Sequence, residues 1–218
     1  MNYLLITILI LLIHGNLFCA ELKAGSFGIT RIQYSGGGDW YSDPSSLPNL
    51  LKFISGYTNI EVNQTENRAR IGEDEFYDNY YLYLTGHGNI SFSDNEAQIL
   101  RNFLLSGGFL HADDNYGMDK YFKREMKKVF PDKDWIEIPK SHPLFNIQFK
   151  FSNGLPKIHE HDNKRPQAFA LFHDNKIIAI YTYEADLGDG WEDSSVHQNP
   201  DSKRKEALKM GTNIILYS

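Results

Sequence analysis

The sequence predicts an α/β fold in which a mostly parallel sheet carries an added antiparallel hairpin. Apolar runs typical of strands alternate with segments whose apolar residues recur at helical spacing. One helical segment, residues 93–106, starts with a capping box and ends at Gly107-Gly108, immediately before an apolar run. Only His173-Asp174-Asn175 separates two later apolar runs, which is typical of a tight hairpin turn. Alternating strands and helices favour parallel strands joined by crossovers, and the hairpin adds the antiparallel part.

Each element has its own signal in the sequence. Strands are expected in residues 27–34, 60–63, 80–85, 109–113, 135–138, 167–172 and 176–183. Helices are expected in residues 45–57, 93–106, 118–130 and 203–217. Ser93 and Glu96 form the capping box of the helix at residues 93–106, and Pro131 ends the helix at residues 118–130. The long segments 140–166 and 184–201 are polar, so each is expected to be either a functional loop or a surface decoration.

Composition and charge limit the classes of function. The 218 residues are 41% hydrophobic and 14% aromatic, which is enough for one domain with a sizeable core. The formal net charge is -6, and a protein that binds nucleic acid needs a basic surface for the phosphates. A nucleic-acid partner is therefore not expected.

The N-terminus predicts export. Residues 4–13 are almost wholly aliphatic and are followed by small residues, which is typical of a secretory signal over residues 1–20. Cleavage would leave residues 21–218 as a single domain, without a transmembrane helix, in the periplasm or cell envelope. Cys19 is the only cysteine: either it is removed with the signal, or it becomes the lipid-bearing first residue of an anchored lipoprotein. A retained N-terminal anchor is the third alternative. In none of these cases is the thiol expected to be catalytic.

Several uncommon motifs occur in order from about Phe27 to the C-terminus. They are YSGGGDWYSDPSSLPNLL, YLYLTGHGNISFSDNE, LLSGGFLHADDNYG, FKREMKKVFP, HPLF, LPKIHEH and DLGDGWED. Together they resemble a bacterial family catalogued as domain of unknown function 4159. The resemblance implies a flavodoxin-like fold of the class I glutamine amidotransferase-like group, with helices on both faces of the sheet, in an exported or membrane-tethered protein. It implies no activity.

Glutamine amidotransferases place a cysteine nucleophile at a sharp turn between a strand and a helix. At the corresponding turn this sequence has Gly86-His87-Gly88. Because the attack on the amide needs a thiolate, glutamine hydrolysis by that route is excluded.

Polar loops follow three of the expected strands. Ligands gather at the carboxyl ends of parallel strands, so these loops predict a binding edge. The glycines of the first loop either bring backbone N–H groups close to a ligand or only allow a tight turn. The indoles of two tryptophans are expected to be exposed, where they either stack on sugar rings or close the edge of the domain. The residues expected to bind a ligand are Gly37, Gly38, Asp39, Trp40, His87, Asn89, Asn115 and Trp191.

His87 is the candidate general base, with Asp113 or Asp114 as its carboxylate partner. The two aspartates should point to opposite faces of an extended strand, so only one is expected to meet His87. Alternatively, His87 only caps a backbone carbonyl. His111 lies inside a strand and is expected to be a core histidine with satisfied hydrogen bonds.

Four residues are candidate ligands for a divalent metal. His159 and His161 share one face of an extended segment, and Asp186 and Asp189 lie in an acidic loop. The spacing matches no known metal motif, so a solvated polar loop is the alternative.

These observations predict an exported domain that binds a saccharide or peptide of the cell envelope at the carboxyl ends of its strands. A metal-dependent hydrolase that uses His87 with Asp113 or Asp114 is one alternative. An interaction module with protein partners in an envelope assembly is the other. For the ligand-binding domain and for the hydrolase, the expected partner is a small molecule or an envelope polymer.

Overall fold

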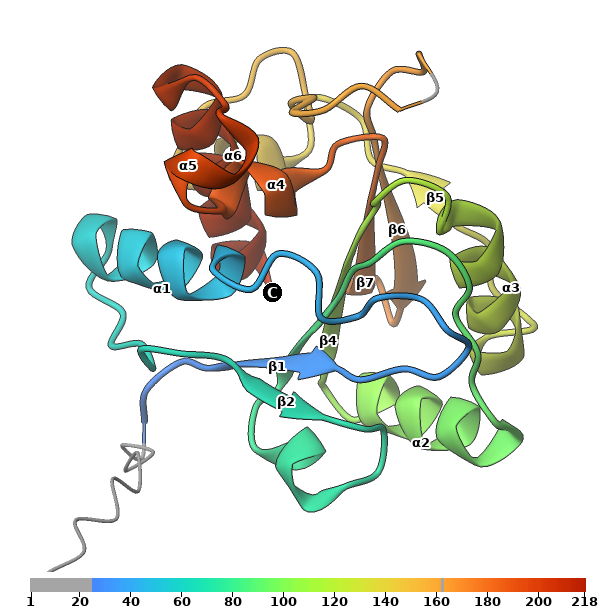
Figure 1. Ribbon diagram of the computed structural model, residues 1–218. Coiled ribbons are helices and arrows are strands. Elements are labelled where there is room, and N and C mark those ends of the chain that lie inside the picture. Colours follow the sequence, from blue (N-terminus) through green and yellow to red (C-terminus); the bar gives the residue numbers. More distant parts are fainter. Residues whose placement is uncertain (1–24, 162) are drawn as a thin grey trace, which may run out of the picture.

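The computed structural model describes residues 25–161 and 163–218, and over this range the chain forms a seven-stranded sheet between two layers of helices (Figure 1). The predicted signal over residues 1–20, including Cys19, lies outside the described residues. Within them, no helix combines the length and the apolar character needed to cross a membrane.

The sheet has the strand order β2-β1-β3-β4-β7-β6-β5. Its strands are β1 (Ile29–Ile32), β2 (Asn67–Ala69), β3 (Tyr81–Leu84), β4 (Phe109–Asp113), β5 (Ile136–Glu137), β6 (Gln167–His173) and β7 (Lys176–Tyr183). Strands β2, β1, β3, β4 and β7 run parallel, whereas β6 is antiparallel to both of its neighbours. The predicted mostly parallel sheet with one antiparallel hairpin is confirmed.

The hairpin turn follows from its sequence. Asp174 and Asn175 have φ angles of 47° and 62°. Positive φ at both central positions matches the right-handed twist of a hairpin, and Asp and Asn tolerate it better than most residues.

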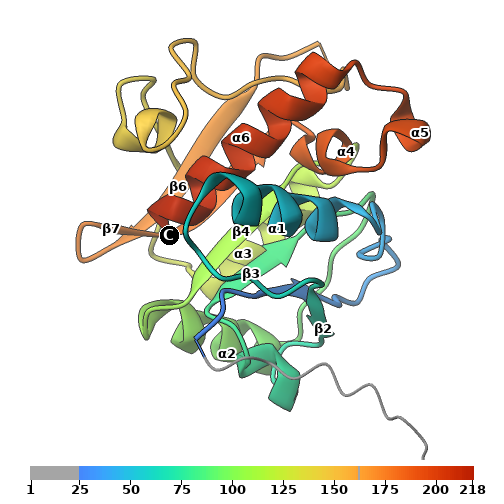
Figure 2. The ribbon, with the colours of Figure 1, turned by 90° about the vertical axis from the view of Figure 1, so that its left-hand side faces the viewer.

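Helices cover both faces of the sheet (Figure 2). Helices α2 (Asp94–Leu105) and α3 (Asp119–Val129) pack on one face, and α1 (Ser46–Tyr57), α4 (Leu187–Trp191) and α6 (Asp201–Tyr217) pack on the other. The alternation of strand side chains explains the two layers, because Tyr81 and Tyr83 of β3 face one layer and Leu82 and Leu84 face the other. The short helices are η1 (Asp74–Tyr77), η2 (Pro143–Asn146) and α5 (Ser194–His197).

The predicted capping box begins α2. The Ser93 hydroxyl accepts from the backbone N–H of Glu96 at 3.2 Å, and the Ser93 N–H donates to the Glu96 carboxylate at 2.7 Å. The helix ends where Gly107 takes a φ of 108°, which a residue with a Cβ rarely adopts.

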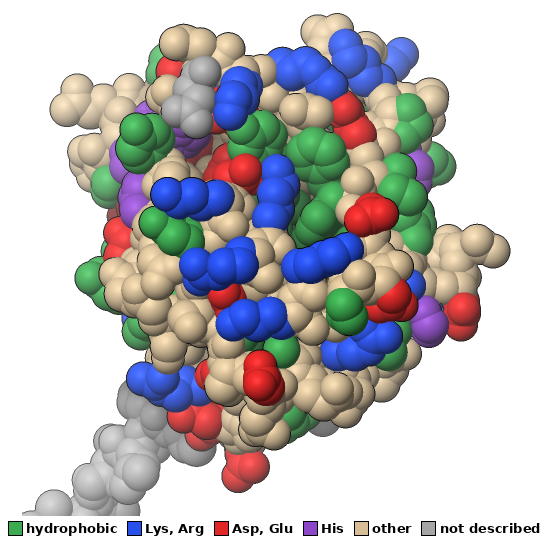
Figure 3. Space-filling view, turned by 90° about the vertical axis from the view of Figure 1, so that its right-hand side faces the viewer, with side chains coloured by type: hydrophobic (Ala, Val, Ile, Leu, Met, Phe, Trp, Pro, Cys, Tyr) green, Lys and Arg blue, Asp and Glu red, His purple; other side chains and the backbone are tan. Residues whose placement is uncertain are grey.

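Lys and Arg side chains gather on the side of the molecule where α3 lies (Figure 3). Two of them, Arg124 and Lys128, pair with the buried carboxylate of Glu125 at 2.6 and 2.7 Å. The carboxylate of Glu125 in α3 thus neutralises part of the positive charge on this surface.

Two predictions about the elements are wrong. Residues 60–63 form no strand but contribute only an isolated bridge between Phe27 and Val62, and the edge strand is β2 instead. The segment 184–201, predicted to be a loop, contains the helices α4 and α5, and every residue of α4 is buried, so it is not a surface decoration.

Candidate metal centre

Four parallel strands deliver acidic and histidine residues to one edge of the sheet. Asp39 and Asp43 follow β1, His87 follows β3, Asp113 ends β4, and the segment with Asp186 and Asp189 follows β7. We call this edge, where β1, β3, β4 and β7 end, the carboxyl edge. In open α/β sheets ligands bind at such an edge because loops from several strands converge there.

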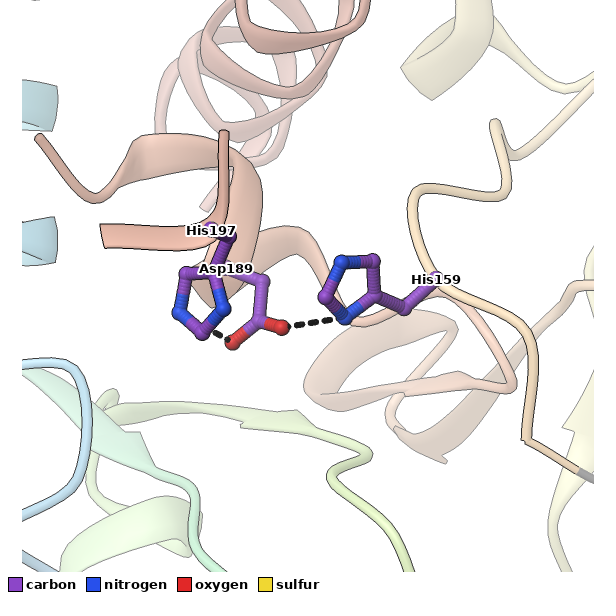
Figure 4. A group of neighbouring side chains, drawn as sticks. All are labelled: His159, Asp189 and His197. Carbon is purple, nitrogen blue, oxygen red and sulfur yellow. Dashed lines mark ion pairs between the residues drawn. The ribbon is translucent and has the colours of Figure 1, made fainter. Parts of the chain in front are cut away.

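Asp189 of α4 lies between two histidines (Figure 4). Its Oδ2 is 2.5 Å from Nδ1 of His159, and its Oδ1 is 3.2 Å from Nε2 of His197 at the end of α5. The Asp189 side chain is only 7% exposed, whereas those of His159 and His197 are 35% and 27% exposed. One ligand atom from each residue lies within 4.8 Å of the others. We call this group the histidine site.

A second group shares Asp189 with the first. Ligand atoms of Asp43, Asp186 and Asp189 also lie within 4.8 Å of one another, and all three residues are buried. We call this group the oxygen site. Asp186 Oδ2 is 3.1 Å from Nε2 of His161 and 3.6 Å from Nδ1 of His159. The metal candidates His159, His161, Asp186 and Asp189 are therefore brought together.

The carboxylates perturb one another. Burial, with the charges of Asp189 and Asp186, raises the pKa of Asp43 to about 8. Burial and the charge of Asp186 raise the pKa of Asp189 to about 7. Burial also acts to raise the pKa of Asp186, but hydrogen bonds from His159 and His161 outweigh it and hold that pKa below its ordinary value. So much buried negative charge is favourable only beside protonated histidines or a cation.

The amide of Asn115 lies between Asp43 and Asp186 and is 1% exposed. In one orientation its nitrogen donates to Oδ2 of Asp43 at 3.4 Å and its oxygen faces Asp186. Turned over, the nitrogen donates to Oδ1 and Oδ2 of Asp186 at 3.2 and 3.3 Å, and the oxygen lies next to donors. The second orientation satisfies both ends of the amide and is therefore the favoured one.

Asp113 supports the fold at this edge. It is fully buried and accepts hydrogen bonds from the Thr182 hydroxyl at 2.5 Å and from the backbone N–H of Gly188 at 2.7 Å. Those bonds fix the start of α4 against β4 and β7. The contacts of Asp113 in this structure are thus with β7 and α4.

The carboxylate that His87 contacts is Asp39. His87 Nδ1 is 3.0 Å from Oδ2 of Asp39, and the backbone N–H of His87 donates to Oδ1 of the same side chain. The His87 side chain is 49% exposed. Asp39 holds the ring by one nitrogen and orients its backbone as well.

His87 and Asp114 line one pocket of about 560 Å³. Asp114 accepts from the backbone N–H of Glu184 at 2.9 Å, and burial raises its pKa to about 7. Because His161 also lines the pocket and contacts Asp186, the pocket adjoins the oxygen site. The lining residues are His87, Gly88, Asp114, Tyr116, Gly117, Asp119, Lys120, Tyr121, His161, Lys164, Tyr183 and Glu184.

The glycine loop packs against the loop after β3. A Cβ on Gly38 would lie 2.6 Å from the carbonyl oxygen of His87, so only glycine fits there, whereas Gly37 has open space around it. Asn89 donates to the Gly36 carbonyl at 2.9 Å and accepts from Arg124 at 3.0 Å. In this structure Gly38 and Asn89 hold two loops together.

The two tryptophans differ from the prediction of exposed indoles. Trp191 is fully buried, with its ring 5.6 Å from that of Tyr83 and 5.9 Å from that of His111. It therefore cannot stack on a sugar. Trp40 is partly buried and lies edge-on to the exposed ring of Tyr41. His111 is a satisfied core histidine as predicted, because Tyr81 and Thr182 hydrogen-bond its two nitrogens, each at 3.1 Å.

Sequence reasoning did not find Asp43 or His197. Asp43 follows the first strand of the sheet and could have been found by extending the carboxyl-edge argument past Trp40. His197 stands alone in a polar segment, and no spacing in the sequence connects it to Asp189 or His159.

The architecture defines a doubly covered α/β domain whose acidic and histidine residues converge on the carboxyl edge. The family model described as Domain of unknown function (DUF4159) matches residues 28–218. The chain belongs to this family, as the motifs indicated. No curated protein matches the chain closely enough to count as a relative.

Proposed function

We propose that this protein binds a divalent cation at the histidine site and uses it to hold a ligand at the carboxyl edge. The carrying observation is the arrangement of His159, Asp189 and His197 around one point. Two imidazoles and one carboxylate form a donor set that suits zinc, iron and related metals, and they leave coordination positions open. The two histidine side chains are partly exposed and the aspartate is buried, so an ion held between them would lie near the protein surface.

A saccharide or peptide of the cell envelope is the proposed ligand. Tyr116, Tyr121 and Tyr183 line the pocket, and the exposed ring of Tyr116 lies 5.9 Å from that of His161. Aromatic faces next to polar groups suit a sugar ring or a peptide side chain. In this proposal the tyrosines of the pocket, and not the buried Trp191, stack on the ligand.

A flavodoxin-like fold of the amidotransferase-like group and an exported location belong to the same proposal. The strand order β2-β1-β3-β4-β7 supports the fold, because the parallel strands numbered in chain order give 2-1-3-4-5, as in flavodoxin-like sheets. The support for export is the aliphatic segment within residues 1–20. Intact-mass measurement of the native protein tests it: loss of the segment supports cleavage, a lipid on Cys19 supports the lipoprotein, and a full-length cytosolic species contradicts export.

Metal analysis tests the cation. The purified protein is equilibrated with zinc, dialysed and analysed beside the variants His159→Ala and His197→Ala. Wild type is expected to retain at least one zinc per chain, and each variant is expected to bind it at least about 10-fold more weakly. His173→Ala, at the end of β6, is the control and should bind like wild type. Equal binding by all four proteins, or no binding by wild type, contradicts the proposal.

The contact between His87 and Asp39 favours a second candidate function, a metal-dependent hydrolase. An imidazole oriented by a carboxylate is the arrangement of a general base, which would take a proton from water as the water attacks the substrate. His87 faces the same pocket as His161, next to the metal centre. Metal-loaded protein is assayed with chromogenic esters and phosphodiesters. His87→Ala and Asp39→Asn should lower the rate and leave the metal content unchanged, whereas metal binding without turnover would favour a binding module.

A further inference from the structure

We propose that a second pocket, beside α6, binds a small organic anion in which a phosphate or carboxylate group is carried on an apolar body. The pocket lies between α6 and the loop at residues 150–156, and its volume is about 580 Å³. None of its lining residues belongs to the histidine site or to the pocket at the carboxyl edge. We call it the lysine pocket.

One face of α6 forms a wall of the lysine pocket. Ser202, Lys205 and Lys209 recur at intervals of three and four residues, which places them on the same side of the helix. Two lysines four residues apart repel each other across one turn, so this spacing by itself disfavours the helix. An anion bound between the two ammonium groups would offset the repulsion.

The loop at residues 150–156 forms the opposite wall, and hydrogen bonds hold it beside α6. The Asn213 amide of α6 donates to the carbonyl oxygen of Phe149 at 2.7 Å and accepts from the backbone N–H of Phe149 at 2.9 Å. Further along, the N–H of Gly154 donates to the carbonyl oxygen of Phe151 at 3.0 Å and closes a turn. The protein therefore forms both walls of the pocket from its own contacts.

The lysines of the pocket differ from others on the surface because they lack acidic partners. Lys123 of α3, for example, pairs with Asp119 at 2.7 Å. Among the described residues, no carboxylate oxygen lies within 4.0 Å of the ammonium nitrogens of Lys150, Lys205 or Lys209. Their positive charge is therefore available to a ligand.

The lining of the pocket defines the class of ligand. It contains three lysines and one acidic residue, Glu206, which is an excess of two positive charges in a chain whose formal net charge is -6. A concave surface lined by charge of one sign attracts ligands of the opposite sign. The buried side chains of Phe151, Leu155 and Pro156 add apolar surface. The volume lies in the range of small-molecule sites, about 300–1,000 Å³, so the lining fits a free small molecule with an anionic and an apolar part.

Octyl phosphate is the probe that tests this proposal, and two partial ligands accompany it. Inorganic phosphate has the charge without the apolar body, and octanol has the apolar body without the charge. Titration calorimetry of the full chain, without added metal, is expected to show that octyl phosphate binds at least about 10-fold more tightly than either partial ligand. Lys205→Glu and Lys150→Glu should each weaken it by at least about 10-fold. Added salt should weaken it as well.

Lys176→Glu is the matched control, because Lys176 is exposed at the start of β7 and does not line the pocket. It should bind octyl phosphate like wild type, and circular dichroism establishes that each variant is folded. Equal affinity of wild type and Lys205→Glu, or no binding by wild type, overturns the proposal. An affinity for octyl phosphate no higher than that for octanol or for phosphate overturns the class of ligand. Binding to vesicles of phosphatidic acid that Lys205→Glu abolishes, without binding of octyl phosphate, would assign the pocket to a lipid surface instead.

Discussion

Gly86→Ala is expected to destabilise the protein by disrupting the loop that carries His87. Gly86 has a φ of 132°, which costs a residue with a Cβ about 1–3 kcal/mol. The added Cβ would also overlap the Tyr34 hydroxyl and lie 2.9 Å from the carbonyl oxygen of Asp39. Overpacking of this kind typically costs about 1–3 kcal/mol. The sum is a loss of roughly 2–6 kcal/mol in the free energy of unfolding.

Two further variants separate the backbone cost from the steric cost. Gly37→Ala is the matched control, because its φ is 89° but a Cβ there would meet nothing within 4 Å. It should lose only about 1–2 kcal/mol. Tyr34→Phe removes a hydroxyl that has no hydrogen-bond partner within the described residues, so by itself it should be nearly neutral. Combined with Gly86→Ala, it should restore at least about 1 kcal/mol, a portion of the overpacking cost.

Equilibrium urea unfolding of the four variants and wild type gives these differences, provided that the slope of free energy against urea is unchanged. The reasoning is refuted if Gly86→Ala and Gly37→Ala lose the same stability within about 0.5 kcal/mol. It is also refuted if Tyr34→Phe restores nothing, because the contact with the hydroxyl would then not exist.

Three other outcomes are expected. Ser93→Ala should lower the free energy of unfolding by about 1 kcal/mol because the cap on α2 is lost; an unchanged urea midpoint would contradict this. Burial lowers the pKa of His111 from 6.5 to about 3, so the unfolded chain takes up a proton below pH 6.5 and the folded protein does not. Wild type therefore loses about 1.4 kcal/mol per pH unit between pH 6.5 and 4.5 through this group. The difference in the free energy of unfolding between wild type and His111→Gln should therefore shrink by about 1.4 kcal/mol for each pH unit below 6.5. A difference that stays constant with pH would exclude the effect. Zinc binding should release a proton from its ligand His159, whose pKa the contact with Asp186 raises. Calorimetry in buffers of different ionisation enthalpy measures the release, and identical heats would argue against it.

Elements with a local cause could be predicted from the sequence. The hairpin follows from Asp174 and Asn175, which adopt positive φ, and α2 follows from the reciprocal hydrogen bonds of Ser93 and Glu96. The parallel sheet follows from the alternation of predicted strands and helices along the chain. In each case the signal lies within a few residues.

Elements that depend on tertiary contacts could not be predicted. Strand β2 has the sequence Asn-Arg-Ala, which has little strand preference, and it forms because β1 presents an open edge. Helix α4 contains Gly188 and Gly190, which look like loop residues. A Cβ on Gly188 would lie 2.8 Å from Oδ2 of Asp43, and one on Gly190 would overlap Ala207 of α6. These glycines allow close packing, and the sequence alone does not show what they pack against.

The site was also predicted only in part, because some of its residues stand in short motifs and others come together only through tertiary contacts. His159, His161, Asp186 and Asp189 stand in short motifs of suggestive composition, and the structure brings them together. His197 joins them only because α5 folds back beside α4. The partner of His87 was placed on β4 by strand adjacency, but the loop after β1 crosses over and supplies Asp39 instead.

Anomalous diffraction from crystals grown with zinc tests the central claim most directly. The account predicts a zinc peak within about 2.0–2.2 Å of a nitrogen of His159, an oxygen of Asp189 and a nitrogen of His197, with at least one coordination position open toward solvent or ligand. A fully occupied zinc ion bound elsewhere, or crystals in which His159 and His197 still contact Asp189 directly with no peak between them, would contradict it.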